Sequence, residues 1–194
     1  MAKEESKYKV ILTLVFIAMF SAMLLAWVNK ITYEPIEMNK RAETKKALKI
    51  VLRGLKNIEY PEFPKEMQVD HSPVKYFKAV GIRGVLMGAA FIVKAPNGFS
   101  GDFEMMVGLD SSGAVIDTYV LDHKETPGLG DGMLKEPFKK QFRGRRLADT
   151  RWMVRKDGGD IDAITAATIT SRAFTAGVKR ALDAFARLKK EGEK

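Results

Sequence analysis

The stretch Asp162-Ala163-Ile164-Thr165-Ala166-Ala167-Thr168-Ile169-Thr170-Ser171 stands directly before the last patterned segment of this chain. After its leading Asp162 the stretch is uncharged, small and rich in hydroxyl groups. Apolar side chains then recur within residues 172–190 at three- and four-residue steps, at Phe174, Val178, Ala181, Leu182, Phe185 and Leu188. This spacing predicts an amphipathic helix with the hydroxyl cluster at its N-terminus.

A helix N-terminus presents free backbone N–H groups and the positive end of the helix dipole, so it favours a bound anion, most often a phosphate. Thr165, Thr168, Thr170 and Ser171 add hydroxyl donors at this point. One of these hydroxyls is a candidate covalent attachment point. On residue types alone the simpler interpretation is a helix cap made by Thr165 or Asp162.

The composition limits the chemistry available to the chain. A length of 194 residues suits one ordinary domain plus an anchor. The absence of cysteine excludes disulfides, thiolate zinc sites and cysteine-ligated iron–sulfur clusters within the chain. With only His71 and His123 and no metal-binding spacing, we expect no metal site. Redox chemistry would therefore require an organic cofactor or non-thiolate metal ligands.

The formal net charge of +9 suggests attraction to nucleic acid, anionic lipid or an acidic partner. Basic residues concentrate beside the apolar N-terminal segment and in the closing helix, which favours a membrane and a protein partner over nucleic acid. A further basic group predicts a surface that faces either an anionic partner or solvent. It comprises Lys139, Lys140, Arg143, Arg145 and Arg146.

Residues 1–9 form a short polar tail, and residues 10–28 contain no charge. At a rise of about 1.5 Å per residue this apolar segment spans about 28 Å, which is close to the hydrocarbon thickness of a bilayer. A cleaved signal peptide is the alternative, but the run is long for one and Trp27 stands where an interfacial anchor would. We expect an uncleaved transmembrane helix, whose orientation the flanking charges do not decide because they lie on both sides.

Residues 29–73 are expected to form a connecting segment. A helix is predicted over residues 34–53, with Pro35 in its first turn and Gly54 at its end. Its basic face suits either lipid headgroups or solvent. An irregular loop is predicted over residues 57–73 because of its three prolines.

From Val74 the pattern changes to that of strands. Residues 74–80 and 85–93 are rich in β-formers, and alternating apolar residues over 103–109 lead through a turn into 114–121. These features predict a twisted antiparallel hairpin. No dinucleotide or Walker fingerprint is present, so the glycines before residue 103 serve a turn.

A second informative stretch follows the hairpin: His123-Lys124-Glu125-Thr126-Pro127-Gly128-Leu129-Gly130-Asp131. One proline and two glycines so close together predict an extended, rigid loop whose backbone can approach a flat ligand. Taken alone, such a stretch is more often a turn.

The run 162–168 resembles the flavinylation motif of the FMN-binding domains in two redox complexes. They are found in the G subunit of the Rnf electron-transport complex and in the C subunit of the sodium-pumping NADH:quinone reductase. In that family a flavin transferase, using FAD and Mg²⁺, joins FMN through its phosphate to the hydroxyl of the last Thr of the motif. The resemblance makes Thr168 the acceptor. Two residues depart from the pattern: Ala166 stands where Gly or Ser is common, and Ile169 where a hydroxyl residue is frequent.

The loop at 123–131 is similar to the His-x-Glu-Thr-Pro-Gly-Leu-Gly loop that lines the flavin in the same domains, and residues 98–121 resemble their core hairpin. The resemblance covers roughly the last hundred residues and implies that the loop touches the isoalloxazine, with Leu129 against a ring face. His123 is either a proton donor to reduced flavin or, as we prefer, a structural residue with a satisfied ring nitrogen. Trp152 and Met153 either border the flavin or, as we prefer, pack in the core. The implied FMN-binding residues are Glu125, Thr126, Leu129, Gly130, Thr165, Ala166, Ala167, Thr168 and Thr170.

The resemblance implies an electron-transfer subunit with covalently bound FMN in an Rnf-type complex, which couples electron flow between ferredoxin and NAD to Na⁺ or H⁺ movement. It implies a single pass through the inner (cytoplasmic) membrane with the FMN domain on the extracytoplasmic side. The expected partners are other subunits of the complex, the lipid bilayer and, during maturation, a flavin transferase. The chain would be a redox subunit rather than an enzyme alone, with no catalytic residue of its own.

Three alternatives remain: the C subunit of the quinone reductase, a stand-alone anchored flavoprotein reductase, and a non-redox membrane-anchored binding module. For all of them we expect an α+β fold. It would consist of a tail (1–9), a transmembrane helix (10–28), a connecting helix and loop (29–73), and a single FMN-binding domain (74–194) whose twisted antiparallel sheet is packed by helices.

Overall fold

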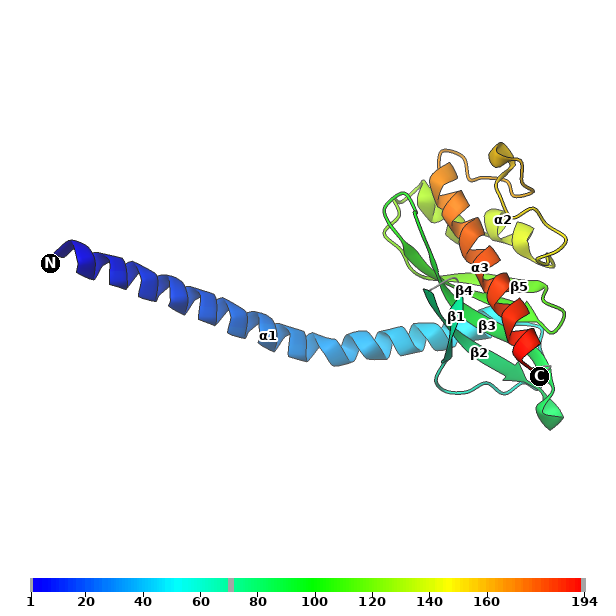
Figure 1. The fold of residues 1–194 in the computed structure, drawn as a ribbon, viewed down its shortest axis with the longest axis horizontal. Helices are drawn as coiled ribbons and strands as arrows, with labels where there is room; N and C mark the ends of the chain where they lie inside the picture. The colour runs from blue at the N-terminus through cyan, green and yellow to red at the C-terminus, as the bar shows by residue number, and fades with distance from the viewer. Residues whose placement is uncertain (1, 70–71, 193–194) are drawn as a thin grey trace. The chain divides into compact units, whose positions relative to one another are not determined.

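The structure is a computed structural model that describes residues 2–69 and 72–192. It divides into two compact units, of which the first ends at Glu43 and the second begins at Thr44. One helix, α1 (Ala2–Val51), contains residues of both (Figure 1). Each unit is described by itself.

The first unit consists of the longer part of α1. Its apolar side chains point outward on all sides, so that Leu12 is 72% and Leu25 is 70% exposed. The described helix is long and apolar enough to cross a membrane, with a mean hydropathy of 2.5 over its most apolar window. The hydroxyl of Thr13 donates to the carbonyl of Lys9 (2.8 Å), which satisfies it without water. These properties are those of a single-pass membrane anchor.

The prediction that a separate helix begins near Pro35 is wrong. Pro35 lies inside α1, and the helix continues through it to Val51. A proline removes one backbone hydrogen bond and strains the turn before it, but here the helix continues on both sides of it.

The second unit contains a five-stranded antiparallel sheet in chain order. The predicted hairpin is confirmed as β4 and β5, which follow β3 in the same meander. Gly88 of β3 pairs with Asp110 of β4, and Ala95 pairs with Phe103. The strands are β1 (Lys65–Val69), β2 (Ser72–Val80), β3 (Leu86–Ala95), β4 (Phe103–Asp110) and β5 (Val115–Asp122).

β1 was not predicted, since residues 57–73 were expected to form an irregular loop. The strand occupies the edge of the sheet, where it pairs only with β2. Most of its side chains are exposed, so its sequence lacks the alternation of a half-buried strand. The prolines that suggested a loop flank the strand rather than interrupt it, because Pro64 precedes it and Pro73 follows it.

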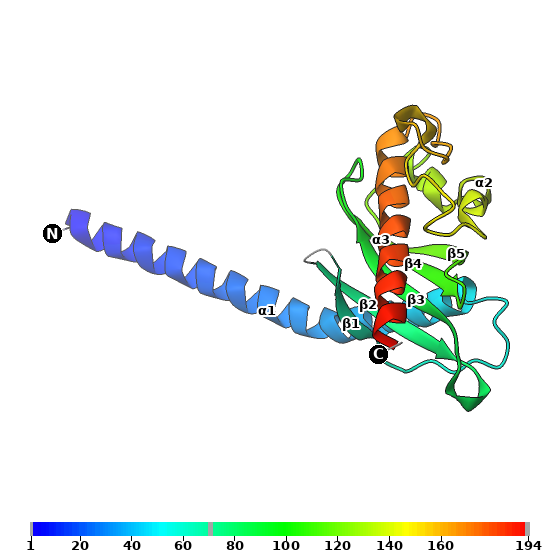
Figure 2. The same cartoon turned by 45° about the vertical axis from the view of Figure 1, so that its right-hand side comes forward.

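The sheet has an apolar core on each face, as the alternation along β4 shows. Met105 and Val107 belong to the larger core and Met106 to the smaller one. Helix α3 (Thr168–Gly192) covers the larger core with the predicted apolar side chains, and it lies across the sheet in Figures 1 and 2. The short elements before it are η1 (Ile82–Gly84), η2 (Gly130–Leu134), α2 (Glu136–Lys139), η3 (Lys140–Phe142) and η4 (Arg155–Asp157).

The last turns of α1 pack on the smaller core. Leu48 and Val51 are buried there with Phe77 of β2 and Met106 of β4. A Cβ atom at Gly108 would lie 1.9 Å from the carbonyl oxygen of Val51, so only glycine allows this close approach of helix and sheet. The compact unit therefore begins well before Val74, where the sequence placed the start of the domain.

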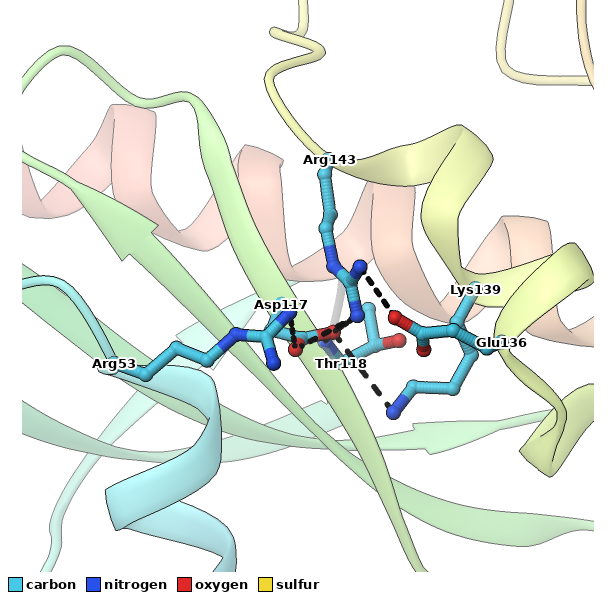
Figure 3. A network of polar contacts seen from close by, with 6 residues as sticks. All are labelled: Arg53, Asp117, Thr118, Glu136, Lys139 and Arg143. Carbon is cyan, nitrogen blue, oxygen red and sulfur yellow. Dashed lines mark hydrogen bonds and ion pairs between the residues drawn. The ribbon is translucent and has the colours of Figure 1, made fainter.

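A buried carboxylate joins three segments of this unit (Figure 3). Asp117 on β5 is 1% exposed, and its oxygens lie 3.0 Å from Arg53, 3.1 Å from Arg143 and 3.8 Å from Lys139. Glu136 pairs with Arg143 as well, and this guanidinium holds the pKa of Glu136 below its usual value. Two members of the predicted basic surface are therefore engaged within the protein.

We expect Asp117→Asn to lower the free energy of unfolding by roughly 3 kcal/mol, because it leaves three cations around a neutral group. This is the lower end of the cost of breaking a buried ion pair, since Arg53 and Arg143 are partly exposed. Urea unfolding of the full chain in detergent, followed by the fluorescence of buried Trp152, measures this. Asp149→Asn is the control, since Asp149 is exposed and lies 4.0 Å from Arg146; its cost should stay under about 0.5 kcal/mol. Equal losses in the two variants would contradict the structural role of Asp117.

Candidate functional site

Three segments far apart in the sequence meet at one end of the second unit (Figures 1 and 2). They are the turn 96–102 between β3 and β4, the loop 123–131 after β5, and the segment 162–168 before α3. A Cβ at Gly98 would lie 2.7 Å from a carboxylate oxygen of Glu125, and one at Gly132 would lie 2.9 Å from Ile164. The two stretches singled out in the sequence are therefore neighbours in space.

The side chain of Glu125 connects these segments. It is 5% exposed, and its Oε2 accepts a hydrogen bond from the hydroxyl of Thr170 in α3 (3.1 Å). Its Oε1 accepts from the backbone N–H of Ser100 in the turn (3.4 Å). Because a buried carboxylate is costly unless it is hydrogen-bonded, these contacts hold the loop to both neighbours.

One ring nitrogen of His123 is satisfied within the protein, as expected for a structural residue. The residue directly follows β5, and its Nδ1 accepts a hydrogen bond from the backbone N–H of Glu125 (3.2 Å). This bond lies at the point where the chain leaves β5 and enters the loop that contains Glu125.

The remaining loop residues divide into two groups. Gly130 is buried, and a Cβ there would lie 2.3 Å from Glu125 Oε2, so the glycine makes room for the carboxylate. Thr126 and Leu129 are exposed, Leu129 by 44%. The geometry gives Glu125 and Gly130 an internal role and leaves Thr126 and Leu129 accessible to a ligand.

The hydroxyl cluster lies at a helix N-terminus, as predicted. Thr168 is the first residue of α3 and is half-buried, whereas Thr165 and Ala166 before it are exposed. Ala167 and Thr170 are buried. Thr168 therefore combines a partly accessible hydroxyl with the free N–H groups of a helix start.

Ser171, in the first turn of α3, bonds to the segment before the helix and does not cap it. Ser171 Oγ accepts from the backbone N–H of Ile164 (2.9 Å) and donates to the carbonyl of Ala167 (2.9 Å). The carboxylate of Asp162 instead pairs with Arg155 (2.9 Å), so a capping role for Asp162 is wrong. The sequence pattern could not distinguish a cap from an ion pair to a residue outside the motif.

Lys156 was missed in the sequence. Its Nζ lies 3.5 Å from Thr168 Oγ1, and it is carried by η4 in the segment that precedes the motif. Trp152 in the same segment is a core residue, as preferred from the sequence, because it is 8% exposed and stacks on Phe142. Met153 beside it is 49% exposed, so the predicted place of Met153 in the core is wrong.

The arrangement fits a planar ligand that carries a phosphate. An accessible hydroxyl, helix N–H groups and Lys156 suit the phosphate, and exposed apolar side chains at Leu129, Phe99 and Ile169 suit an aromatic ring. Within the described part of the chain no group of three metal-ligating residues occurs, and His71 lies outside the described residues.

Replacing the two partners of the Glu125–Thr170 hydrogen bond should reveal coupling between them. Glu125→Gln weakens the acceptor and Thr170→Val removes the donor, so a double-mutant cycle should give a coupling of about 1–2 kcal/mol. Urea unfolding of the four proteins measures it. Thr175→Val is the matched control, because the buried Thr175 hydroxyl donates to the carbonyl of Ser171 within the same helix (2.8 Å). Coupling of Glu125 to Thr175 as strong as that to Thr170 would refute this connection.

The protein should be more stable with glycine in place of Ala166. Its φ of 60° lies in the left-handed region, which costs an L-residue roughly 1–2 kcal/mol. Ala166→Gly is therefore expected to raise the free energy of unfolding by about 1 kcal/mol. Ala163→Gly in the same segment, where φ is not positive, should lower it instead. Two changes of the same sign would mean that the strain at Ala166 is not relieved by glycine.

Comparison with known proteins agrees with this geometry. Residues 98–183 match the family model of the FMN-binding domain. The G subunit of an ion-translocating oxidoreductase complex from Shewanella loihica is 33% identical over 180 residues, which cover 87% of this chain and 84% of that protein. The corresponding protein from Salmonella typhimurium is 47% identical over 92 residues, or 45% of each chain.

A solved structure shares the fold. The C subunit of the Na⁺-translocating NADH-quinone reductase from Parabacteroides distasonis superposes with a TM-score of 0.55, covering 77% of this chain and 93% of that one at 17% identity. The predicted fold class, with an N-terminal apolar helix and an antiparallel sheet packed by helices, is confirmed. From the similarity to the Shewanella loihica protein over most of both lengths, it follows that the chain belongs to the family of G subunits of ion-translocating oxidoreductase complexes.

Proposed function

We propose that this chain is an electron-transfer subunit of an Rnf-type complex and carries FMN as a phosphoester on Thr168. The match to FMN-binding domains supports the cofactor, and the family supports the complex. The position of Thr168 supports it as the attachment site. Its hydroxyl is partly accessible at the start of α3 and lies 3.5 Å from the ammonium group of Lys156.

Attachment would consist of one phosphoryl-group transfer. A bond forms between Thr168 Oγ and the FMN phosphorus of FAD, the phosphoanhydride bond of FAD breaks, AMP leaves, and the hydroxyl proton is released. A flavin transferase with Mg²⁺ supplies the catalysis during maturation. The chain contributes an accessible acceptor, while the Glu125–Thr170 bond keeps the first turn of α3 against the 123–131 loop.

Bound FMN would supply reversible transfer of one or two electrons. The chain would place the ring beside the accessible residues Thr126 and Leu129 of the loop that Glu125 and Gly130 fix from within. The exposed Thr165 and Ala166 and the buried Ala167 would form the backbone path to the acceptor. Neighbouring subunits would donate and accept the electrons.

The anchor sets the place of this reaction. We propose that α1 crosses the inner membrane once, with its N-terminus in the cytoplasm and the FMN domain outside. A covalent bond suits that compartment, because a dissociated cofactor would be lost there. In the complex, the electron flow would connect ferredoxin and NAD to Na⁺ or H⁺ movement, with both soluble carriers binding other subunits.

The C subunit of a quinone reductase is the second candidate, because a protein of that name shares the fold. The 33% identity to a G subunit over most of both chains favours the Rnf-type assignment over the 17% identity to the quinone-reductase protein. A non-redox binding module is disfavoured, because it would not account for the match of residues 98–183 to FMN-binding domains.

Co-expression with a flavin transferase tests the attachment. The wild-type chain should gain the mass of one FMN phosphoester and show flavin fluorescence after denaturing electrophoresis. Thr168→Ala should show neither, since it lacks the acceptor oxygen, and Thr168→Ser should retain both. Labelled Thr168→Ala would move the site to another residue. An unlabelled wild-type chain beside a transferase that labels a second substrate would exclude covalent attachment.

A further inference from the structure

The 3₁₀ turn η4 presents three consecutive charged residues, Arg155, Lys156 and Asp157, to residues 162–171, called here the attachment segment. The outer two form ion pairs that bracket this segment. Arg155 Nε lies 2.9 Å from Asp162 at its beginning, and Asp157 accepts two hydrogen bonds from Arg172 just after its end (2.7 and 2.8 Å). The turn is thereby held to both ends of the segment that contains Thr168.

The backbone under this turn is fixed as well. The N–H of Arg155 donates to the carbonyl of Ile161 (2.8 Å), and Val154 pairs with Ile161 in a parallel bridge. Both apolar side chains are fully buried. The base of the Lys156 side chain is therefore positioned by the core and by the two ion pairs, and its ammonium group donates a long hydrogen bond to Thr168 Oγ1 (3.5 Å).

The charges around Thr168 do not cancel. The pairs Arg155–Asp162 and Asp157–Arg172 are each neutral, and the bidentate contact of Arg172 holds the pKa of Asp157 below its usual value, so that pair persists at neutral pH. Within the described residues, Lys156 has no carboxylate within ion-pair distance; its Nζ instead contacts Thr168 Oγ1. The excess is one positive charge, and a phosphodiester carries one negative charge at neutral pH.

We infer that Lys156 is the phosphate-binding residue of the attachment site. This inference rests on the proposed function. The ammonium group would attract the phosphate of the incoming flavin nucleotide to the Thr168 hydroxyl and afterwards neutralise the phosphodiester. Asp162 and Arg172 would act as positioning residues, because their ion pairs hold η4 and so aim Lys156 at Thr168. This gives the leading carboxylate of the motif a physical role.

The test compares variants of the full chain in detergent, incubated with purified flavin transferase, FAD and Mg²⁺. Lys156→Gln should slow the initial rate of covalent labelling roughly tenfold, the loss expected for one charge-assisted contact. Lys156→Arg should restore most of the rate. Lys190→Gln, which makes the same change of charge near the far end of α3, should match the wild type.

A second readout separates phosphate binding from recognition by the transferase. In chains labelled to completion, the ³¹P resonance of the phosphodiester should differ between Lys156→Gln and the wild type, but not between Lys190→Gln and the wild type. The thermal unfolding midpoint should not change, because Lys156 is exposed. If Lys156→Gln does unfold early, Lys156→Met takes its place.

The outcomes are distinguishable. An unlabelled wild-type chain would overturn the proposed function together with this inference. A labelled wild type with an equally fast Lys156→Gln would overturn the inference and leave the proposed function standing. A slow Lys156→Arg, or an unchanged ³¹P resonance in Lys156→Gln, would also overturn it, because the charge at the phosphate would then not be the cause.

Discussion

The candidate site depends on one buried carboxylate. Glu125 receives hydrogen bonds from the turn before β4 and from the first turn of α3, and Gly98 and Gly130 leave the space that its oxygens occupy. Burying a carboxyl group is costly unless hydrogen bonds replace its contacts with water, so the bonds from Ser100 and Thr170 keep the segments together. Thr168 and the exposed Leu129 therefore keep their relative positions because the buried Glu125 side chain bonds the 123–131 loop to the start of α3.

The same unit is tied to the end of its anchor helix by direct backbone contact. Val51 lies against Gly108 so closely that no side chain fits between them, and Arg53 continues the contact to the buried Asp117. The residues of α1 from Ala47 onward are core residues of the sheet. Removing the whole of α1 would therefore expose the smaller core, and a soluble version of the unit has to retain these last turns.

Periodicity and motif together predicted most of the fold and the neighbourhood of the site. The apolar steps of α3 and the alternation of β4 were sufficient because each element buries one face. β1 was not predicted because an exposed edge strand has no alternation. The continuity of α1 through Pro35 was not predicted because a proline is also typical of the first turn of a new helix. Lys156 escaped for a different reason: its relation to Thr168 is created by the fold, and no spacing in the sequence encodes it.

The distribution of ion pairs bears on what this surface recognises. The basic residues between α2 and residue 146 look like a docking surface for an acidic protein, yet Lys139 and Arg143 are directed at Asp117, and Arg146 lies beside Asp149. In η4, Arg155 and Asp157 are likewise paired, whereas Lys156 has no carboxylate within ion-pair distance among the described residues. The single uncompensated charge of Lys156 beside one accessible hydroxyl suits a small anion with one negative charge better than an extended acidic surface. A singly charged anion neutralises the ammonium group, whereas an acidic surface would bring unpaired negative charges with it.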